Sequence, residues 1–256
     1  MPDHSTWFSF IIPSDLLANF RNAVGLSFIN HTPVTVQYVL NFAFVAIVLL
    51  ILVLMARGRI ARVEEALVPD GKFSLRSFFE AMIEGTLSTM EGIMDRKSAM
   101  YFLPLIGTCA LIIFFSNFLG LIPGFLPPTS NLSTTAAMAL VIFITTHIYG
   151  VKEHGFIKYM LHFCGPLRHP LALPLMILMF CIEIISHFAR PLSLSVRLMG
   201  NMYADHAVVG GFLTVSPIIL PVAPLVLGVV VCIVQTAVFC ILSSVYIGGA
   251  VAHEEH

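Results

Sequence analysis

The chain has 256 residues, of which 58% are hydrophobic and only 11% are charged, and its mean hydropathy is +0.94. A soluble domain of this length cannot bury so much apolar surface, so we expect the chain to lie in a lipid bilayer. Its net charge is −1 and it has no extended basic run, which excludes nucleic acid as an expected partner. The five cysteines have no metal-ligand spacing, and we expect neither a metal site nor a cofactor.

The N-terminal part of the chain predicts one membrane crossing. Residues 1–35 are mixed in character and form either an interfacial helix or a loop outside the membrane. Residues 36–56 then form an uncharged run of the length that crosses a bilayer. Three arginines follow at once, whereas only Arg21 precedes the run. The positive-inside rule therefore places the N-terminus outside and the arginines in the cytoplasm.

Residues 73–95 predict an amphipathic helix on the cytoplasmic side. Its acidic residues gather on one face: Glu80, Glu84, Glu91 and Asp95. Its apolar residues recur at helical spacing: Leu75, Phe78, Phe79, Met82, Ile83, Leu87, Met90 and Met94. This helix lies either at the membrane interface, against a partner, or against the protein's own loops.

The next two crossings are predicted at residues 100–122 and 132–151. No formally charged residue occurs between Ala99 and Val151, and a proline-rich and glycine-rich turn separates the two runs. Asn117 lies near the outer end of the first run, and His147 lies near the inner end of the second. Basic residues follow the second run, which places the next loop in the cytoplasm.

The last two crossings are predicted at residues 171–209 and 222–251. A continuous helix over 171–209 would be about 58 Å long, nearly twice the hydrocarbon thickness of about 30 Å. It therefore either breaks at Pro191 or lies steeply tilted, and we favour a tilted and bent helix. Gly210-Gly211 and the prolines that follow predict the turn, and the last helix carries one conspicuous polar residue, Gln235. The predicted fold is an all-α polytopic membrane protein with five membrane helices and a long C-terminal hairpin.

One of these helices carries nearly all of the charge that lies within the membrane. A helical projection places six of its polar residues within about 80°: Glu183, His187, Arg190, Arg197, Asn201 and Asp205. His206 lies about 100° from Asp205 and is expected to face the crossings that carry Asn117 and His147. A charge in hydrocarbon costs about 3 kcal/mol or more, so such residues line a water path or meet a partner charge. The stripe predicts an ion path, although single members could simply join helices.

The segment Arg190–His206, RPLSLSVRLMGNMYADH, resembles the a subunit of F-type ATP synthases, and Gln235 on the next helix fits the same pattern. Supporting matches are SNFLGLIPGFLPPTSNLSTT, the spacing from Glu183 to Arg197, and the C-terminal VYIGGAVAHEEH. The resemblance covers residues 36–256. Many bacterial members carry glutamate where this chain has His206, and some pair it with an ionisable residue near Gly228.

The resemblance implies a proton-translocating subunit that has no nucleotide site of its own. Arg197 would be the stator arginine that faces the rotating ring of c subunits, with Gln235 beside it. Two offset half-channels would use Glu183, His187 and Arg190 on one side, and Asn201, Asp205, His206, Asn117 and His147 along the rest of the path. The implied partners are the c ring, the b subunits of the peripheral stalk, the F1 head indirectly, and lipid. The implied location is the bacterial inner membrane, with a cytoplasmic C-terminus.

Two other classes of protein use buried polar residues in membranes. A secondary proton or cation transporter usually has two similar halves, but this chain shows no repeat, and its charge gathers in one helix. A haem-binding subunit would need facing histidine pairs, whereas His147, His187 and His206 are few and are expected at different depths. The transporter is the alternative that we retain.

Overall fold

The computed structural model describes residues 36–60, 74–122, 124–155, 159, 173–215 and 221–251. Within these ranges the chain is all helical. The elements are α3 (Val36–Ile60), α5 (Leu75–Glu91), α6 (Arg96–Gly120), the short η1 (Pro128–Ser130), α7 (Leu132–His154), α9 (Leu173–Val215) and α10 (Val222–Val251). Five of these helices are long and apolar enough to cross a membrane: α3, α6, α7, α9 and α10. The predicted all-helical fold with five membrane helices is confirmed.

Polar side chains at the predicted turns fix where three of the helices begin. Ser74 caps α5 by accepting from the Ser77 amide, and Asp95 caps α6 by accepting from the Lys97 amide. Asn131 caps α7, because its Oδ1 accepts a hydrogen bond of 2.9 Å from the Ser133 amide. Each cap satisfies a backbone N–H that has no partner within the helix, so the turn sequence itself sets the boundary.

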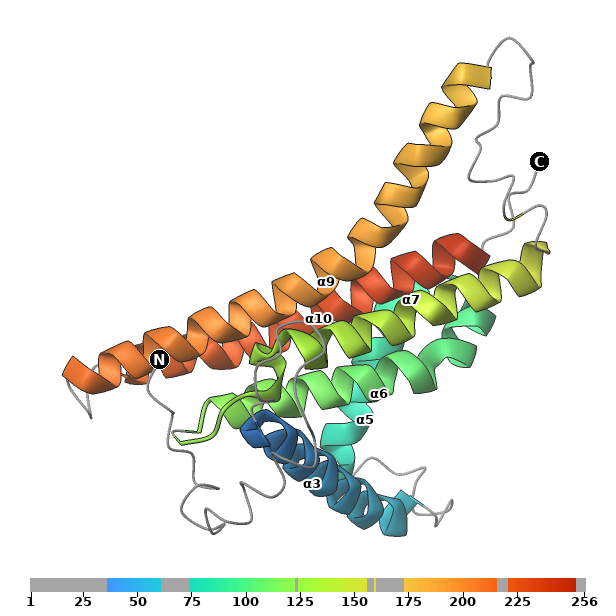
Figure 1. Cartoon of the computed structure of the whole chain (residues 1–256). Helices are drawn as coiled ribbons and strands as arrows, with labels where there is room; N and C mark the ends of the chain where they lie inside the picture. The colour runs from blue at the N-terminus through green and yellow to red at the C-terminus, as the bar shows by residue number, and fades with distance from the viewer. Residues whose placement is uncertain are drawn as a thin grey trace.

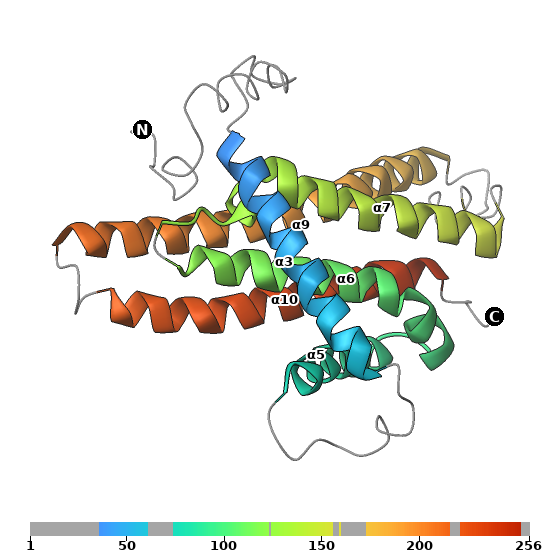
Figure 2. The same cartoon turned by 90° about the horizontal axis from the view of Figure 1, so that it is seen from below.

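The core lies where α5, α6, α7 and α10 meet. Figure 1 shows α6, α7 and α10 running side by side, with α9 against α7 and α10, and Figure 2 shows α3 crossing α6 at a steep angle. The largest apolar side chains of the core are fully buried: Met90, Ile106, Ile113, Ile142 and Ile247. In lipid, such interlocking packing rather than the hydrophobic effect holds helices together.

The amphipathic helix α5 packs on the chain's own helices. It contacts α6, α10 and α3, and buries Phe79 and Met90 against them. Its acidic residues stay exposed, and one of them, Glu80, forms a 2.7 Å ion pair with the buried Arg76 one turn away. The sequence left packing on the protein's own loops as one alternative, whereas the contacts observed among the described residues are with the protein's own helices.

α9 is one continuous helix that passes through Pro191 without a break. Its 43 residues correspond to a length of about 65 Å. In Figure 1 its N-terminal part bends away from the bundle, as expected for a helix with an internal proline. Gly210 and Gly211 lie inside α9, so the predicted turn at this pair is wrong. Backbone groups in lipid must bond within the helix, which favours continuing it through glycines.

The loop between α6 and α7 folds back onto the end of α6. A Cβ atom on Gly120 would lie 2.7 Å from Cβ of Pro127, so only glycine allows this close approach. The Thr129 hydroxyl donates a 2.6 Å hydrogen bond to Oδ1 of Asn117, which anchors η1 to α6. The loop is therefore a packed cap on one end of the bundle.

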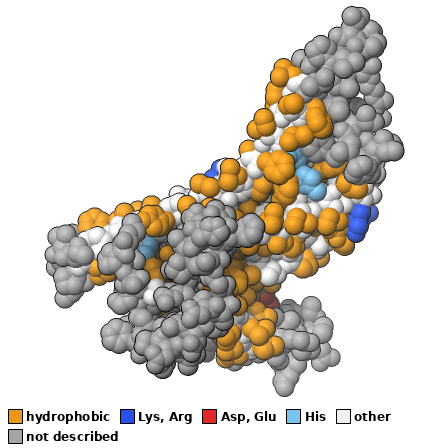
Figure 3. Space-filling view, viewed as in Figure 1, with side chains coloured by type: hydrophobic (Ala, Val, Ile, Leu, Met, Phe, Trp, Pro, Cys, Tyr) orange, Lys and Arg blue, Asp and Glu red, His pale blue; other side chains and the backbone are white. Residues whose placement is uncertain are grey.

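Much of the outer surface is apolar. In Figure 3 hydrophobic side chains cover most of the visible surface of α9 and α7, with few charged groups among them. Among the described residues, α9 and α10 expose a series of large apolar side chains, including Ile185, Leu192, Val226 and Ile233. This surface suits lipid or another membrane-embedded protein rather than water.

Candidate functional site

The predicted polar stripe on α9 divides into three groups along the helix. The first, which we call the Glu183 cluster, comprises Glu183, His187 and Arg190 on α9, His147 on α7 and Tyr246 on α10. The second is Arg197 with Asn201. The third, the Asp205 group, comprises Asp205 and His206 on α9, Gly228 on α10 and Leu121 after α6. At 1.5 Å per residue, Arg197 lies about 21 Å along the helix from Glu183 and about 12 Å from Asp205.

The Glu183 cluster brings together two histidines from facing helices, His147 and His187, so the expectation that these two lie at different depths is wrong. The rings of His147 and His187 lie 5.4 Å apart between centroids, at an interplanar angle of 80°. Nδ1 of each ring lies 2.9–3.0 Å from the carbonyl oxygen four residues earlier in its own helix. A carbonyl only accepts, so Nδ1 is the donor in each of these two hydrogen bonds.

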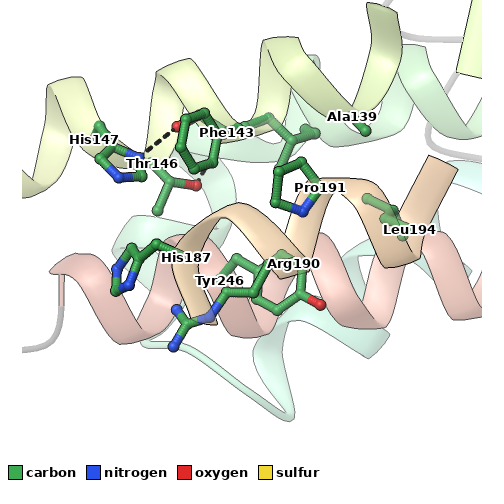
Figure 4. Close-up of a pocket in the computed structure, with 10 residues that line it drawn as sticks. Ala139, Phe143, Thr146, His147, His187, Arg190, Pro191, Leu194 and Tyr246 are labelled. Carbon is green, nitrogen blue, oxygen red and sulfur yellow. Dashed lines mark hydrogen bonds between the residues drawn. The ribbon is translucent and has the colours of Figure 1, made fainter. Parts of the chain in front are cut away.

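A carboxylate and a guanidinium complete this cluster. Oε1 of Glu183 lies 3.3 Å from Nδ1 of His187 and 3.9 Å from Nη2 of Arg190. The Arg190 guanidinium also lies over the Tyr246 ring, 5.6 Å from its centroid. Figure 4 shows His147, His187, Arg190 and Tyr246 around one small pocket between α7, α9 and α10. The cluster therefore combines an acid, a cation and two titratable rings at the junction of three helices.

Tyr159, which follows α7 in the chain, lies beside His147. Its ring lies 6.1 Å from the His147 ring and packs so closely on Gly150 that a Cβ there would be 2.6 Å from its Cε2. Burial raises the pKa of the Tyr159 hydroxyl, and the nearby Arg190 charge acts in the opposite direction. Tyr159 was not predicted, because the sequence gives no sign that this loop returns to α7.

The middle group differs from the first by its exposure. Arg197 is exposed although it lies in the middle of a helix that is long and apolar enough to cross a membrane. Among the described residues it forms no ion pair. Asn201 and Gln235 are half-buried, and no hydrogen bond joins Gln235 to Arg197 within the described part of the chain. A cation exposed on an apolar helix lines a water path or meets a partner charge.

The Asp205 group lies at the other end of the bundle. A Cβ on Gly228 would lie 2.8 Å from Oδ2 of Asp205 and 2.4 Å from Cδ2 of Leu121. The Asp205 carboxylate thus points at α10 and the end of α6, and it occupies the space that a side chain at position 228 would take. His206 is half-buried beside it. The close approach of Asp205 to Gly228 could not be read from a helical projection, which ignores neighbouring helices.

Asn117 and His147, which were both predicted to line the ion path, belong to different parts of the bundle. Asn117 is buried near the end of α6 and holds Thr129, at the loop that caps this end of the bundle. His147 lies beside His187, about 28 Å of helix before His206, so His206 and His147 lie at different depths. An angle around α9 gives a direction and does not specify the depth at which a neighbour lies.

Comparison with known proteins gives a consistent result. Residues 6–248 match the model of the family described as "ATP synthase A chain". The chain is 38% identical to "ATP synthase subunit a" of Sorangium cellulosum (strain So ce56) over the full length of both proteins. It is 44% identical to "ATP synthase subunit a" of Geobacter sulfurreducens, covering 79% of this chain and 84% of the relative. It is also 44% identical to "ATP synthase subunit a 2" of Syntrophotalea carbinolica, covering 79% and 82%.

Proposed function

The chain belongs to the ATP synthase A chain family, the proton-translocating stator subunits of the enzyme's membrane sector, and from this premise we propose a role for each group of the site. Arg197 is the stator arginine that meets the carboxylates of a rotating ring of c subunits. The Glu183 cluster belongs to the half-channel on the cytoplasmic side. The Asp205 group, with Asn117, belongs to the half-channel on the outer side.

The observation that carries this proposal is the exposed Arg197 between two separate titratable groups. The pKa of arginine lies above about 12, so its side chain stays protonated and cannot pass a proton between the half-channels. A ring carboxylate releases its proton when it is opposite Arg197 and regains one after passing. Each charge that crosses the membrane contributes about 2.3 kcal/mol per 100 mV, and successive steps turn the ring.

Family membership favours this function over a secondary transporter. The structure also agrees with this choice: α9 and α10 expose a broad apolar surface around Arg197, which suits a membrane-embedded partner. We assign this surface to the c ring. The b subunits and lipid are assigned to the remaining membrane surface, and the F1 head is reached only through other subunits.

A cross-linking experiment tests the ring assignment. We expect a cysteine at Val196, which is 45% exposed beside Arg197, to form a disulfide with a cysteine placed next to the ring carboxylate. The matched control is a cysteine at Leu198, which is 3% exposed and is expected to form no cross-link. Both variants are made in a chain without its native cysteines and oxidised in membranes. Equal cross-linking at the two positions, or none at Val196 in an assembled complex, would contradict the assignment.

We further propose that the chain lies in a bacterial inner membrane, with its N-terminus outside and its C-terminus in the cytoplasm. The support is the excess of arginine after α3 and of basic residues after α7. A cysteine at Ser88, which is exposed on α5, is expected to react with an impermeant thiol reagent only in inside-out vesicles. A cysteine at Leu132, exposed at the start of α7, is expected to react only in right-side-out vesicles. The opposite pattern would invert the topology.

A further inference from the structure

Asn41 is a buried amide on α3 that none of the proposed roles uses. Its side chain is 0% exposed, and among the described residues neither Oδ1 nor Nδ2 has a hydrogen-bond partner. The rest of the helix from Gln37 to Ala56 is apolar apart from its first residues. An amide buried without partners costs several kcal/mol, so in a membrane helix it calls for an explanation.

The position of Asn41 follows from its neighbours on the same helix face. Phe44, three residues later, stacks on Phe125 of the α6–α7 loop with ring centroids 5.7 Å apart. Val45, four residues later, is 3% exposed. Residues three and four apart lie on one face of a helix, so Asn41 faces the same side as both. Within the described residues, α3 contacts α6, α5 and η1.

Two further polar atoms are buried without partners near the same end of α6. They are Oγ of Ser116 and Nδ2 of Asn117, and both residues are at most 1% exposed. Asn117 satisfies only its Oδ1, through the hydroxyl of Thr129 in η1. Thr129 belongs to η1, which contacts both α3 and α6, and Phe125 of the same loop stacks on Phe44 of α3. The junction of α3, α6 and η1 thus gathers donors and acceptors that the described residues leave unsatisfied.

We propose that this junction is a hydration site, in which Asn41, Ser116 and Asn117 hold internal water that extends the outer half-channel to α3. Water is the ligand that fits, because the site offers two amide NH₂ groups, an amide oxygen and a hydroxyl, but no charge. A water held by two to four such groups satisfies them at once and carries protons along a hydrogen-bonded chain. Asn41 is then a positioning residue for water. This inference rests on the proposed outer path through Asn117.

The reactivity of an introduced cysteine tests directly whether water reaches position 41. A thiol reacts with Ag⁺ or a methanethiosulfonate reagent as the thiolate, which forms only where water reaches it. In a chain without native cysteines, we expect a cysteine at position 41 to react from the outside. We expect a cysteine at Val45, on the same face one turn deeper, not to react. If neither position reacts, or if both react alike, the site is not a local hydration site and the proposal is overturned.

A measurement of proton flux tests whether Asn41 contributes to the outer half-channel. Asn41→Leu keeps the volume but removes both polar atoms, and we expect passive proton uptake from the outer side to slow about tenfold, which corresponds to about 1.4 kcal/mol in the barrier. Asn41→Ser keeps a hydroxyl and is expected to stay within about twofold of the wild-type rate. Subunit content in the membrane, measured by immunoblot, controls for assembly. Normal flux in assembled Asn41→Leu, or equal loss of flux and assembly in both variants, would overturn the role.

Measurements on the same vesicles distinguish a failure of this inference from a failure of the proposed function. Arg197→Ala is expected to stop coupled pumping without changing the reactivity of a cysteine at position 41. If Arg197→Ala pumped normally, the proposed function would fail while the hydration test still stood on its own result. If coupled pumping is lost as expected but Asn41→Leu conducts normally, only the further inference fails.

Discussion

Replacing Arg197 with alanine is expected to lower ATP-driven proton pumping and ATP synthesis by at least about 100-fold, the range seen when one preorganised charge is removed from a reaction path. Without the cation, nothing forces a ring carboxylate to give up its proton between the half-channels. Arg197 is exposed and, among the described residues, forms no ion pair, so its loss is not expected to unfold the subunit. Acidification of inside-out vesicles on adding ATP measures the effect.

Arg197→Lys is expected to fail almost as completely. Lysine keeps a positive charge, but its compact ammonium lacks the planar fork and loses its proton more readily when it is desolvated. A passive leak in Arg197→Ala that is smaller in Arg197→Lys would fit the separating role. The matched control is Arg96→Ala, at the first residue of α6, whose side chain is 80% exposed, and this variant is expected to pump normally. Pumping by Arg197→Lys at more than about half of the control rate would exclude the assigned role.

The second large effect is expected at Gly228, where an added side chain meets the Asp205 carboxylate. Gly228→Val is expected to slow proton transport about tenfold or more, because it must displace Oδ2 of Asp205 and the tip of Leu121. Gly228→Ala is expected to have a smaller effect in the same direction. The measurement is ATP-driven pumping normalised to assembled complex. Gly249→Val is the control on the same helix, since a Cβ at Gly249 meets nothing within 4 Å.

A double variant shows whether the displacement of Asp205 or that of Leu121 slows proton transport. Leu121→Ala removes one of the two clashes with position 228 and leaves the other. If the carboxylate position controls transport, Gly228→Ala combined with Leu121→Ala stays slow. Full recovery in that double variant would show that only packing was lost and that the placement of Asp205 is not critical. Asp205→Asn, which keeps the shape and removes the charge, is then the direct comparison.

The Glu183 cluster shows what the structure adds to the predicted residues, namely their neighbours on other helices. Glu183, His187 and Arg190 were expected on one helix face, and they do interact through Oε1 of Glu183. Their partners from other helices, His147 and Tyr246, determine where that face points. His147 was predicted to belong to the path, but its pairing with His187 had no signal in the sequence.

The sequence by itself determined the features that depend on one helix and its solvent. Lipid cannot satisfy a bare backbone, so apolar runs specify five membrane helices, and the angle per residue specifies the polar stripe on α9. The motif around Arg197 indicated the family before any contact was known. The turn predicted at Gly210-Gly211 failed because a glycine pair stops a helix in water more readily than in a membrane.

Only the tertiary structure decided which helices meet each polar residue, and at what depth. It placed the Asp205 carboxylate against Gly228, paired His147 with His187, packed α5 on its own chain, and buried the Asn41 amide beside η1. The physical reason is that periodicity gives a direction around one helix axis, whereas contacts depend on the crossing angles and offsets of several helices. These are set by the packing of side chains distant in sequence, and no single helix encodes them.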